Sequence, residues 1–204
     1  TAKWDKQAKF FHYKPKHLLL TAVKWDHADL YPTEKEYFEA FTKLFAMVPE
    51  DGIIVACIDT ETLPKLLARS KKKFTSYGKN EKADYRYENI KQTPEDLGFD
   101  IVNGKNTYHV KSPLLGVYNI ENITGCFAMA HKAGIAAEKI LGGIASFSGL
   151  KRRMEKRLEG DVTVIDDLAH SAEKAKSVLE NIRSIYTGLV TAVYEPNIGN
   201  RTPQ

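Results

Sequence analysis

The chain has 204 residues, 43% of them hydrophobic, and its 30 Lys and Arg against 26 Asp and Glu give a net charge of +4. This length allows one large domain or two modest ones, and no apolar run is long enough to span a membrane. Nucleic-acid binding is the weakest class, because the basic runs are scattered and nearly balanced by acidic residues. Cys57 and Cys126 lie among apolar residues without zinc spacing, which predicts small reduced core residues in a cytoplasmic protein.

The first third of the chain alternates between strand and helix patterns. Residues 17–23 are a short β-rich run, and Thr33 followed three positions later by Glu36 is a capping box that predicts the start of a helix. Residues 50–60 contain a continuous apolar strand of the kind that parallel sheets prefer. Residues 61–73 predict a second helix with its leucines on one side. This order predicts an α/β sheet.

The middle of the chain has a different pattern. Residues 74–115 alternate aromatic and polar residues around turn signals such as Asn103-Gly104, which predicts short, mostly antiparallel strands. Residues 119–147 predict two helices, with Gly134 ending the first of them.

Composition changes after this helical stretch. We therefore expect two domains, residues 1–147 and residues 148–204. In the second, residues 161–167 predict a strand, residues 175–185 an amphipathic helix, and residues 188–197 a further strand.

Two segments carry side chains that could bind a nucleotide and its metal ion. His27, between Asp26 and Asp29, directly follows a predicted strand, where open α/β sheets bind ligands. It could hold Mg²⁺ or orient phosphate, although a solvated turn explains the same residues and is favoured from spacing alone. Asn119 and Asn122 lie three apart on one predicted helix, where two carboxamides can face a base edge. Simple capping of that helix by Asn119 is the alternative, and it is favoured for the motif alone.

A basic run and an acidic strand end follow one another near residue 150. Residues 151–153 are Lys-Arg-Arg, which suits phosphate binding or, about equally well, an exposed charged hairpin. Asp166 and Asp167 end a predicted strand, where their carboxylates could accept from ribose hydroxyls or simply form a turn. His170 opens the following helix, near the positive end at which anions gather.

Taken in order, these segments resemble the Mur ligases, the ATP-dependent amide-forming enzymes of peptidoglycan assembly. "WDHADLY" resembles the D-H-x-D segment of their central domain, and "GVYNIENITGCFAMAHKAGI" their G-x-H-N-x-x-N helix. "FSGLKRRMEKRLEGDVTVIDDLAHS" resembles their F-x-G-V-K-R-R-x-E … D-D-x-A-H-H-P junction. "KFFHYKPKHLLL" and "AVYEPNIGNRT" look most similar to the tripeptide-recycling type of the family.

The resemblance implies a fold and an activity. The expected fold is α/β: the central-domain sheet with flanking helices and a small antiparallel section, then the start of a Rossmann-like C-terminal domain. The implied cytoplasmic enzyme uses ATP and Mg²⁺ to join UDP-N-acetylmuramate to L-Ala-γ-D-Glu-meso-diaminopimelate through an acyl phosphate, with L-alanine as the alternative acceptor. No nucleic-acid or membrane partner is implied.

The resemblance also implies which residues form the site. The residues at matching positions are His27 for Mg²⁺, Asn119 and Asn122 for adenine, Arg152 and Arg153 for ATP, Asp167 for ribose, His170 near the phosphates, and Arg201 for the incoming peptide. His170 and Arg153 are the catalytic candidates.

Part of the family pattern is missing from this sequence. The Gly-rich phosphate loop G-x-x-G-K-T/S does not occur, so we expect a piece of a longer enzyme that is inactive in isolation. Ala22, Tyr118 and Ser171 depart from the family pattern and favour, as an alternative, a non-catalytic nucleotide-binding or scaffold domain. A folyl-polyglutamate-type or cyanophycin-type ligase is a further alternative, against which the K-R-R-x-E junction argues.

Overall fold

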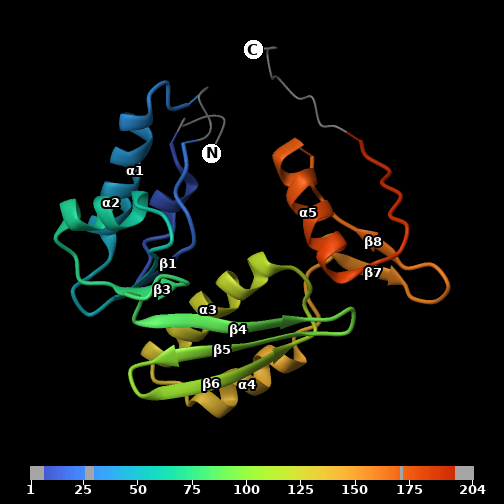
Figure 1. The fold of residues 1–204 in the computed structure, drawn as a ribbon. Helices are drawn as coiled ribbons and strands as arrows, with labels where there is room; N and C mark the ends of the chain where they lie inside the picture. The colour runs from blue at the N-terminus through green and yellow to red at the C-terminus, as the bar shows by residue number, and fades with distance from the viewer. Residues whose placement is uncertain (1–6, 26–29, 171, 196–204) are drawn as a thin grey trace.

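The computed structural model describes residues 7–25, 30–170 and 172–195. It contains a large sheet flanked by helices and, beside it, a two-stranded ribbon with one helix (Figure 1). His27 and Arg201 lie outside the described residues. Within those residues, no helix combines the length and the apolar character that a bilayer-crossing helix needs.

Six strands form the large sheet and lie side by side in chain order. They are β1 (His17–Leu20), β2 (Ile53–Cys57), β3 (Thr75–Gly78), β4 (Tyr85–Gln92), β5 (Leu97–Asn103) and β6 (Asn106–Ser112). The pairs from β1 to β4 are parallel, and the pairs from β4 to β6 are antiparallel. The α/β prediction is therefore confirmed. Within residues 74–115, predicted as mostly antiparallel, β4 to β6 form antiparallel pairs, whereas β3 pairs parallel with both of its neighbours.

Helices α1 (Glu34–Met47) and α2 (Thr62–Ser70) connect the first parallel strands. The predicted capping box opens α1: the backbone N–H of Glu36 donates to Thr33 Oγ1 over 3.3 Å, and the backbone N–H of Thr33 donates to Glu36 Oε2 over 3.1 Å. A short 3₁₀ helix, η1 (Lys9–His12), precedes β1. The start of α1 thus satisfies two of the backbone donors that a helix end leaves open.

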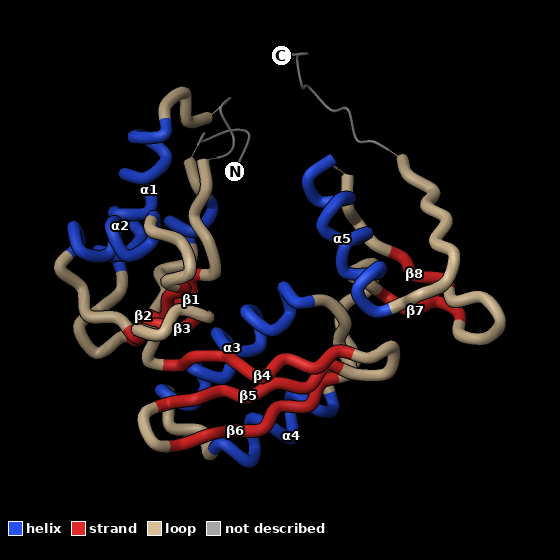
Figure 2. Tube along the Cα trace, viewed as in Figure 1, coloured by secondary structure: helices blue, strands red, loops and turns tan. Residues whose placement is uncertain are grey.

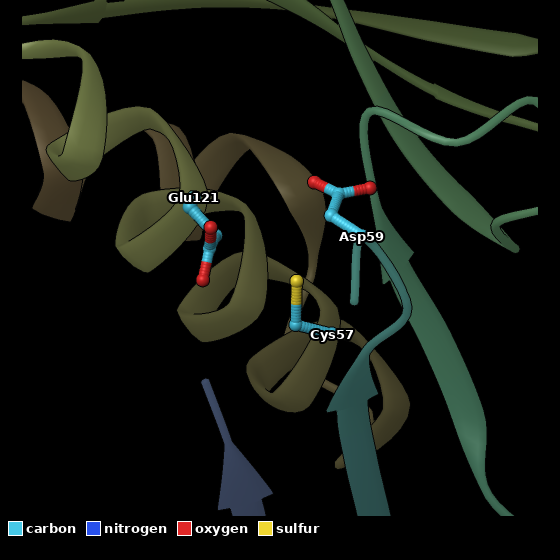
Figure 3. Close-up of side chains that lie close together, drawn as sticks. All are labelled: Cys57, Asp59 and Glu121. Carbon is cyan, nitrogen blue, oxygen red and sulfur yellow. The ribbon is translucent and has the colours of Figure 1, made fainter. Parts of the chain in front are cut away.

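The two faces of the parallel strands bury different helices, because successive side chains of a strand point to opposite faces. Ile54 and Ala56 pack in one core cluster, which is completed by leucines and phenylalanines of α1 and α2. Val55 and Cys57 pack in the other, beneath α3 (Val117–Lys132) and α4 (Ala137–Ser146). Cys57 ends β2 on this second face, with Glu121 of α3 opposite it (Figure 3).

The helices α3 and α4 also cover one face of the antiparallel strands (Figure 2). Gly134 separates the two helices with a φ of +87°, as the sequence predicts for a helix-ending glycine. The β5–β6 hairpin turns through Gly104 and Lys105, and Gly104 has a φ of +60°. The turn signal at Asn103-Gly104 is confirmed by this pairing.

The last part of the chain forms a second, smaller sheet. Strands β7 (Glu155–Leu158) and β8 (Val164–Asp166) pair antiparallel, and helix α5 (Ala172–Ile185) follows them. Hydrogen bonds join α5 to the larger part: the Val117 N–H donates to Asn181 Oδ1 over 2.9 Å, and Gln92 Nε2 donates to Ser184 Oγ over 3.3 Å. The division into residues 1–147 and 148–204 stays a prediction.

Two expectations about the fold are wrong. The predicted strand at residues 188–197 does not form in its described part, residues 188–195, where Leu189 is 94% exposed and Val193 fully exposed. A strand needs a hydrogen-bonding neighbour, and no described strand lies beside this segment. Cys126 is exposed rather than in the core, because it lies on the outer side of α3; Cys57 is buried as expected.

Candidate functional site

A pocket of about 320 Å³ lies where the first turns of α3 meet the segment after α4. It is lined by Leu114, Tyr118, Asn119, Asn122, Phe147, Gly149, Leu150 and Arg153. The two asparagines and Arg153, which are distant in sequence, therefore contribute to one concave surface. The structure brings these three predicted nucleotide contacts together, and their roles stay a proposal.

Helix α3 positions the two asparagines on one side. Its N-cap is Gly116, with a φ of +96°, and Asn119 lies inside the first turn, so the capping role considered for Asn119 is wrong. Asn119 Nδ2 donates to the Leu115 carbonyl over 2.7 Å, which fixes the orientation of its carboxamide. The Asn122 side chain is exposed and makes no hydrogen bond within the described part of the chain. Asn122 therefore presents both a donor and an acceptor to the pocket.

Tyr118 connects this pocket to the acidic end of β8. Burial raises the pKa of the Tyr118 hydroxyl to about 12, and the charge of Asp167 adds to this shift while Arg153 opposes it. The hydroxyl is therefore neutral near pH 7 and able to donate a hydrogen bond. Tyr118 replaces the histidine of the family pattern, so this position contributes an aromatic hydroxyl in place of an imidazole.

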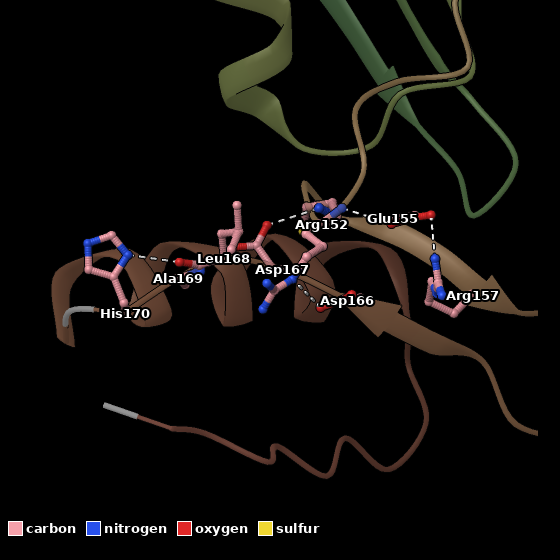
Figure 4. Close-up of polar contacts among 9 residues, drawn as sticks. Arg152, Glu155, Arg157, Asp166, Asp167, Leu168, Ala169 and His170 are labelled. Carbon is pink, nitrogen blue, oxygen red and sulfur yellow. Dashed lines mark hydrogen bonds and ion pairs between the residues drawn. The ribbon is translucent and has the colours of Figure 1, made fainter. Parts of the chain in front are cut away.

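The segment between α4 and β7 is held in an unusual backbone conformation. Arg152 and Met154 have φ values of +59° and +49°, a region that non-glycine residues rarely adopt. Hydrogen bonds fix it from several sides: the Arg152 N–H donates to Glu155 Oε2 over 2.8 Å, and the Arg152 carbonyl accepts from the Leu168 N–H over 3.0 Å (Figure 4). Arg153 lies within this constrained segment, so its direction toward the pocket is set by the backbone.

Asp167 has a structural task in the same segment. Its Oδ2 accepts from the Met154 N–H over 2.9 Å, and its Oδ1 accepts from the Ala169 N–H over 2.8 Å. Asp167 thus joins the end of β8 to the start of β7. Each carboxylate oxygen has a second lone pair, so the predicted ribose contact remains compatible with these bonds.

The remaining predicted residues are not brought into the pocket. Arg152 turns away from it, and its Nε lies 3.7 Å from Asp166 Oδ1. His170 lies just before α5, where its Nδ1 is 2.9 Å from the Leu168 carbonyl (Figure 4). It does not line the pocket. The predictions for His27 and Arg201 fall outside the described residues.

A second cluster was missed by reasoning from the sequence. Cys57, Asp59 and Glu121 place one sulfur and two carboxylate oxygens within 4.8 Å of one another. Burial raises the pKa of the Cys57 thiol to about 12, and burial also raises the pKa of the Glu121 carboxyl. Asp59 lies two residues after the end of the apolar strand β2, which is a signal that sequence reasoning could have used. Its partner Glu121 lies on a distant helix and joins the cluster only in the fold.

Comparison with known proteins gives one consistent result. Residues 3–130 match the Mur ligase middle domain. The UDP-N-acetylmuramate–L-alanine ligase of Pelagibacter ubique is 31% identical over 202 residues, which are 95% of this chain and 44% of that protein. The solved UDP-N-acetylmuramate–alanine ligase of Thermotoga maritima superposes with a TM-score of 0.77 at 21% identity, over 90% of this chain and 41% of that one.

A murein peptide ligase from Psychrobacter arcticus has a TM-score of 0.65 at 25% identity, over 90% of this chain and 38% of that one. The chain thus spans less than half the length of the relatives it matches. The family match extends over more than half of the chain, from before β1 into the last turn of α3, and includes both pocket asparagines. The chain belongs to the Mur ligase family.

Proposed function

We propose that the intact protein is an ATP-dependent amide ligase of peptidoglycan synthesis that acts on UDP-N-acetylmuramate. The observation that carries this proposal is the meeting of Asn119, Asn122 and Arg153 in one pocket, within a chain of the Mur ligase family. The pocket is polar at these three residues and apolar at Leu114 and Leu150. This combination suits a flat base with a hydrogen-bonding edge and a charged tail.

The size of the pocket fits part of ATP. Its volume of about 320 Å³ is at the lower end of the range of roughly 300–1,000 Å³ that ligand pockets span. We therefore assign the pocket to the adenine and its immediate surroundings. The family's metal ligand would be His27, which lies outside the described residues, so the proposal for Mg²⁺ rests on the sequence resemblance alone.

The chain's own residues would bind and orient the reactants. When bound, ATP supplies the phosphoryl group that activates the muramyl carboxylate, and Mg²⁺ offsets the negative charge. Asn122 would hold the base edge, while Asn119 is fixed beside it by its bond to Leu115. The Arg153 guanidinium would contribute a permanent positive charge at the junction. We keep His170 as a second catalytic candidate, located at the start of α5.

The family assignment leaves open which amine is joined to UDP-N-acetylmuramate. The sequence resemblance favours the tripeptide L-Ala-γ-D-Glu-meso-diaminopimelate. The curated relatives instead favour L-alanine, since two of them, at 31% and 26% identity, are UDP-N-acetylmuramate–L-alanine ligases. We propose L-alanine as the acceptor to test first, with the tripeptide as the alternative. Phosphate release by the intact protein, measured with each acceptor in turn, distinguishes the two.

The nucleotide site is tested by calorimetry of Mg·ATP binding to the 204-residue chain. Asp167→Ala is a poor variant for this purpose, because it also frees the Met154 and Ala169 N–H groups. Asn122→Ala removes an exposed carboxamide and leaves the fold intact, and Asn106→Ala in the β5–β6 hairpin is the matched control. A hydrogen bond worth about 0.5–1.5 kcal/mol predicts roughly 2- to 13-fold weaker binding for Asn122→Ala alone.

Equal affinity in the native chain and Asn122→Ala would contradict the adenine assignment. ATP binding with the expected Asn122 dependence, but without phosphate release by the intact protein in the presence of UDP-N-acetylmuramate and either amine, would favour a non-catalytic nucleotide-binding role. The exchange of histidine for Tyr118 is the observation that supports this second candidate.

A further inference from the structure

Three potential metal ligands meet at the carboxyl end of β2. Cys57 is the last residue of that strand, Asp59 follows two positions later, and Glu121 faces both from α3 (Figure 3). Their ligand atoms lie within 4.8 Å of one another. Cys57 is 2% exposed, so the sulfur is withdrawn from solvent.

Tyr77 gives an independent reason to expect a ligand here. It is fully buried, and its hydroxyl has no hydrogen-bond partner among the described residues. Cys57 and Tyr77 are direct partners across β2 and β3, so both side chains point to the face beneath α3. A Cβ added at Gly125 would lie 3.0 Å from the Tyr77 hydroxyl, which places that hydroxyl against α3 one turn beyond Glu121. A buried hydroxyl without a partner is unfavourable, so a partner for it beside α3 is expected.

We propose that Cys57, Asp59 and Glu121 bind one divalent transition-metal ion, for which Zn²⁺ is the best match. A thiolate with two carboxylates selects a borderline-soft ion rather than Mg²⁺, which takes oxygen ligands. Three protein ligands leave a fourth position for water in a tetrahedral site. The buried Tyr77 hydroxyl would pair with that water.

Hydrogen bonds already hold the Asp59 carboxylate in place. Its carboxylate accepts from the Lys79 N–H over 2.7 Å, from the Asn80 N–H over 2.9 Å and from the Tyr87 hydroxyl over 3.1 Å. Gly78 makes room for this arrangement, because a Cβ there would lie 2.4 Å from Asp59 Oδ1. Metal-binding carboxylates are commonly oriented by such hydrogen bonds.

Binding needs small adjustments and releases a proton. Bonds of about 2.0–2.3 Å hold tetrahedral ligand atoms roughly 3.5 Å apart, so the three side chains must close slightly from their present separation. The thiol of Cys57 must give up its proton to solvent, because the thiolate is the ligand. The ion is distinct from the Mg²⁺ of the proposed reaction, and its binding needs no ATP.

Equilibrium dialysis of the 204-residue chain against Zn²⁺ tests the proposal directly. We expect one Zn²⁺ per native chain, and affinity at least tenfold lower in Cys57→Ala and in Glu121→Gln. Cys126→Ala is the matched control, because it removes the other free cysteine from an exposed position. With Co²⁺ in place of Zn²⁺, thiolate-to-metal charge-transfer absorption should appear in the native chain and in Cys126→Ala, and should be absent in Cys57→Ala.

Three results would overturn the proposal: no Zn²⁺ on the native chain, full affinity in Cys57→Ala, or equal losses in Cys57→Ala and Cys126→Ala. Circular dichroism identifies any variant that fails to fold. Should Cys57→Ala be such a variant, Tyr87→Phe tests the site instead, because it removes one of the hydrogen bonds that orient Asp59 and keeps the aromatic ring. Loss of an orienting hydrogen bond predicts about 10- to 100-fold weaker metal affinity, and unchanged affinity in Tyr87→Phe would then count against the site.

Discussion

The same substitution, glycine to alanine, should have opposite effects on stability in α3 and in α4. Gly125 is buried in α3, and an added Cβ would lie 2.8 Å from the Tyr77 ring and 3.0 Å from Leu19 Cδ1. Gly143 lies inside α4, and an added Cβ there meets nothing within 4 Å. Both positions are helical, so the backbone benefit of alanine is the same and only the packing differs.

The magnitudes follow from two opposing effects. Replacing glycine by alanine within a helix stabilises by about 0.5–1 kcal/mol, because the unfolded chain loses backbone freedom. Gly143→Ala should therefore raise the free energy of unfolding by that amount. At Gly125 the added methyl group must displace a fully buried tyrosine, and such overpacking costs about 1–3 kcal/mol. Gly125→Ala should therefore lower the free energy of unfolding, by about 1 kcal/mol as a central value.

Urea unfolding followed by far-UV circular dichroism measures both effects, provided that the slope with denaturant is unchanged. The double variant Gly125→Ala, Tyr77→Phe should recover part of the loss, because the hydroxyl contact disappears. Equal stabilisation by Gly125→Ala and Gly143→Ala would refute the reasoning, since it would mean that Tyr77 does not lie against α3.

Three further predictions concern stability. Thr33→Ala should lower the free energy of unfolding by about 1 kcal/mol through loss of the capping box, whereas Thr107→Ala on β6 should not; urea unfolding of both variants checks this. Burial raises the pKa of Glu121 above its usual 4.5, so its ionised form destabilises the fold at neutral pH. Glu121→Gln in chelator should therefore be more stable than the native chain at pH 7, and the difference should fade as the pH falls through the folded pKa toward 4.5; a constant difference would contradict this. Bonds from Asn89 and His109 lower the pKa of Asp100 below its usual 3.8, so its stabilisation relative to Asp100→Asn is complete above pH 3.8 and should disappear as the pH falls through the folded pKa; unfolding curves from pH 7 to pH 2 measure it.

Sequence reasoning succeeded where a local pattern has a local cause. The capping box at Thr33 and the helix end at Gly134 depend on neighbouring residues only, and both form as expected. The strand expected at residues 188–197 failed, because its pattern says nothing about a neighbouring strand, and Val193 is left fully exposed. The prediction that Cys126 lies in the core was wrong for a related reason. Apolar neighbours in the sequence do not show which side of α3 faces the core.

The candidate site also combines features that local sequence spacing predicts with features that depend on the whole fold. Asn119 and Asn122 share a side of α3 by helical spacing, which the sequence shows. Their meeting with Arg153 was expected only from the family resemblance, because it depends on how the chain returns after α4. No resemblance indicated that Asp167 also holds the backbone of Met154. For the cluster of Cys57, Asp59 and Glu121, the sequence offered only the position of Asp59 after an apolar strand, because Glu121 joins the cluster from a distant helix.

The junction after α4 shows why such features escape a reading of the sequence. Non-glycine residues in left-handed backbone conformations cost about 1–3 kcal/mol each, and they persist only where surrounding contacts determine them. Arg152 and Met154 are held in this way by Glu155, Asp167 and the Leu168 N–H. From the sequence alone, phosphate binding and an exposed charged hairpin suited the basic run about equally well. In the fold these residues form a constrained turn that separates two adjacent arginines, with Arg152 directed toward Asp166 and Arg153 toward the asparagines of α3. The constraint is therefore the physical reason that one arginine of the pair, and not both, is available to a ligand in the pocket.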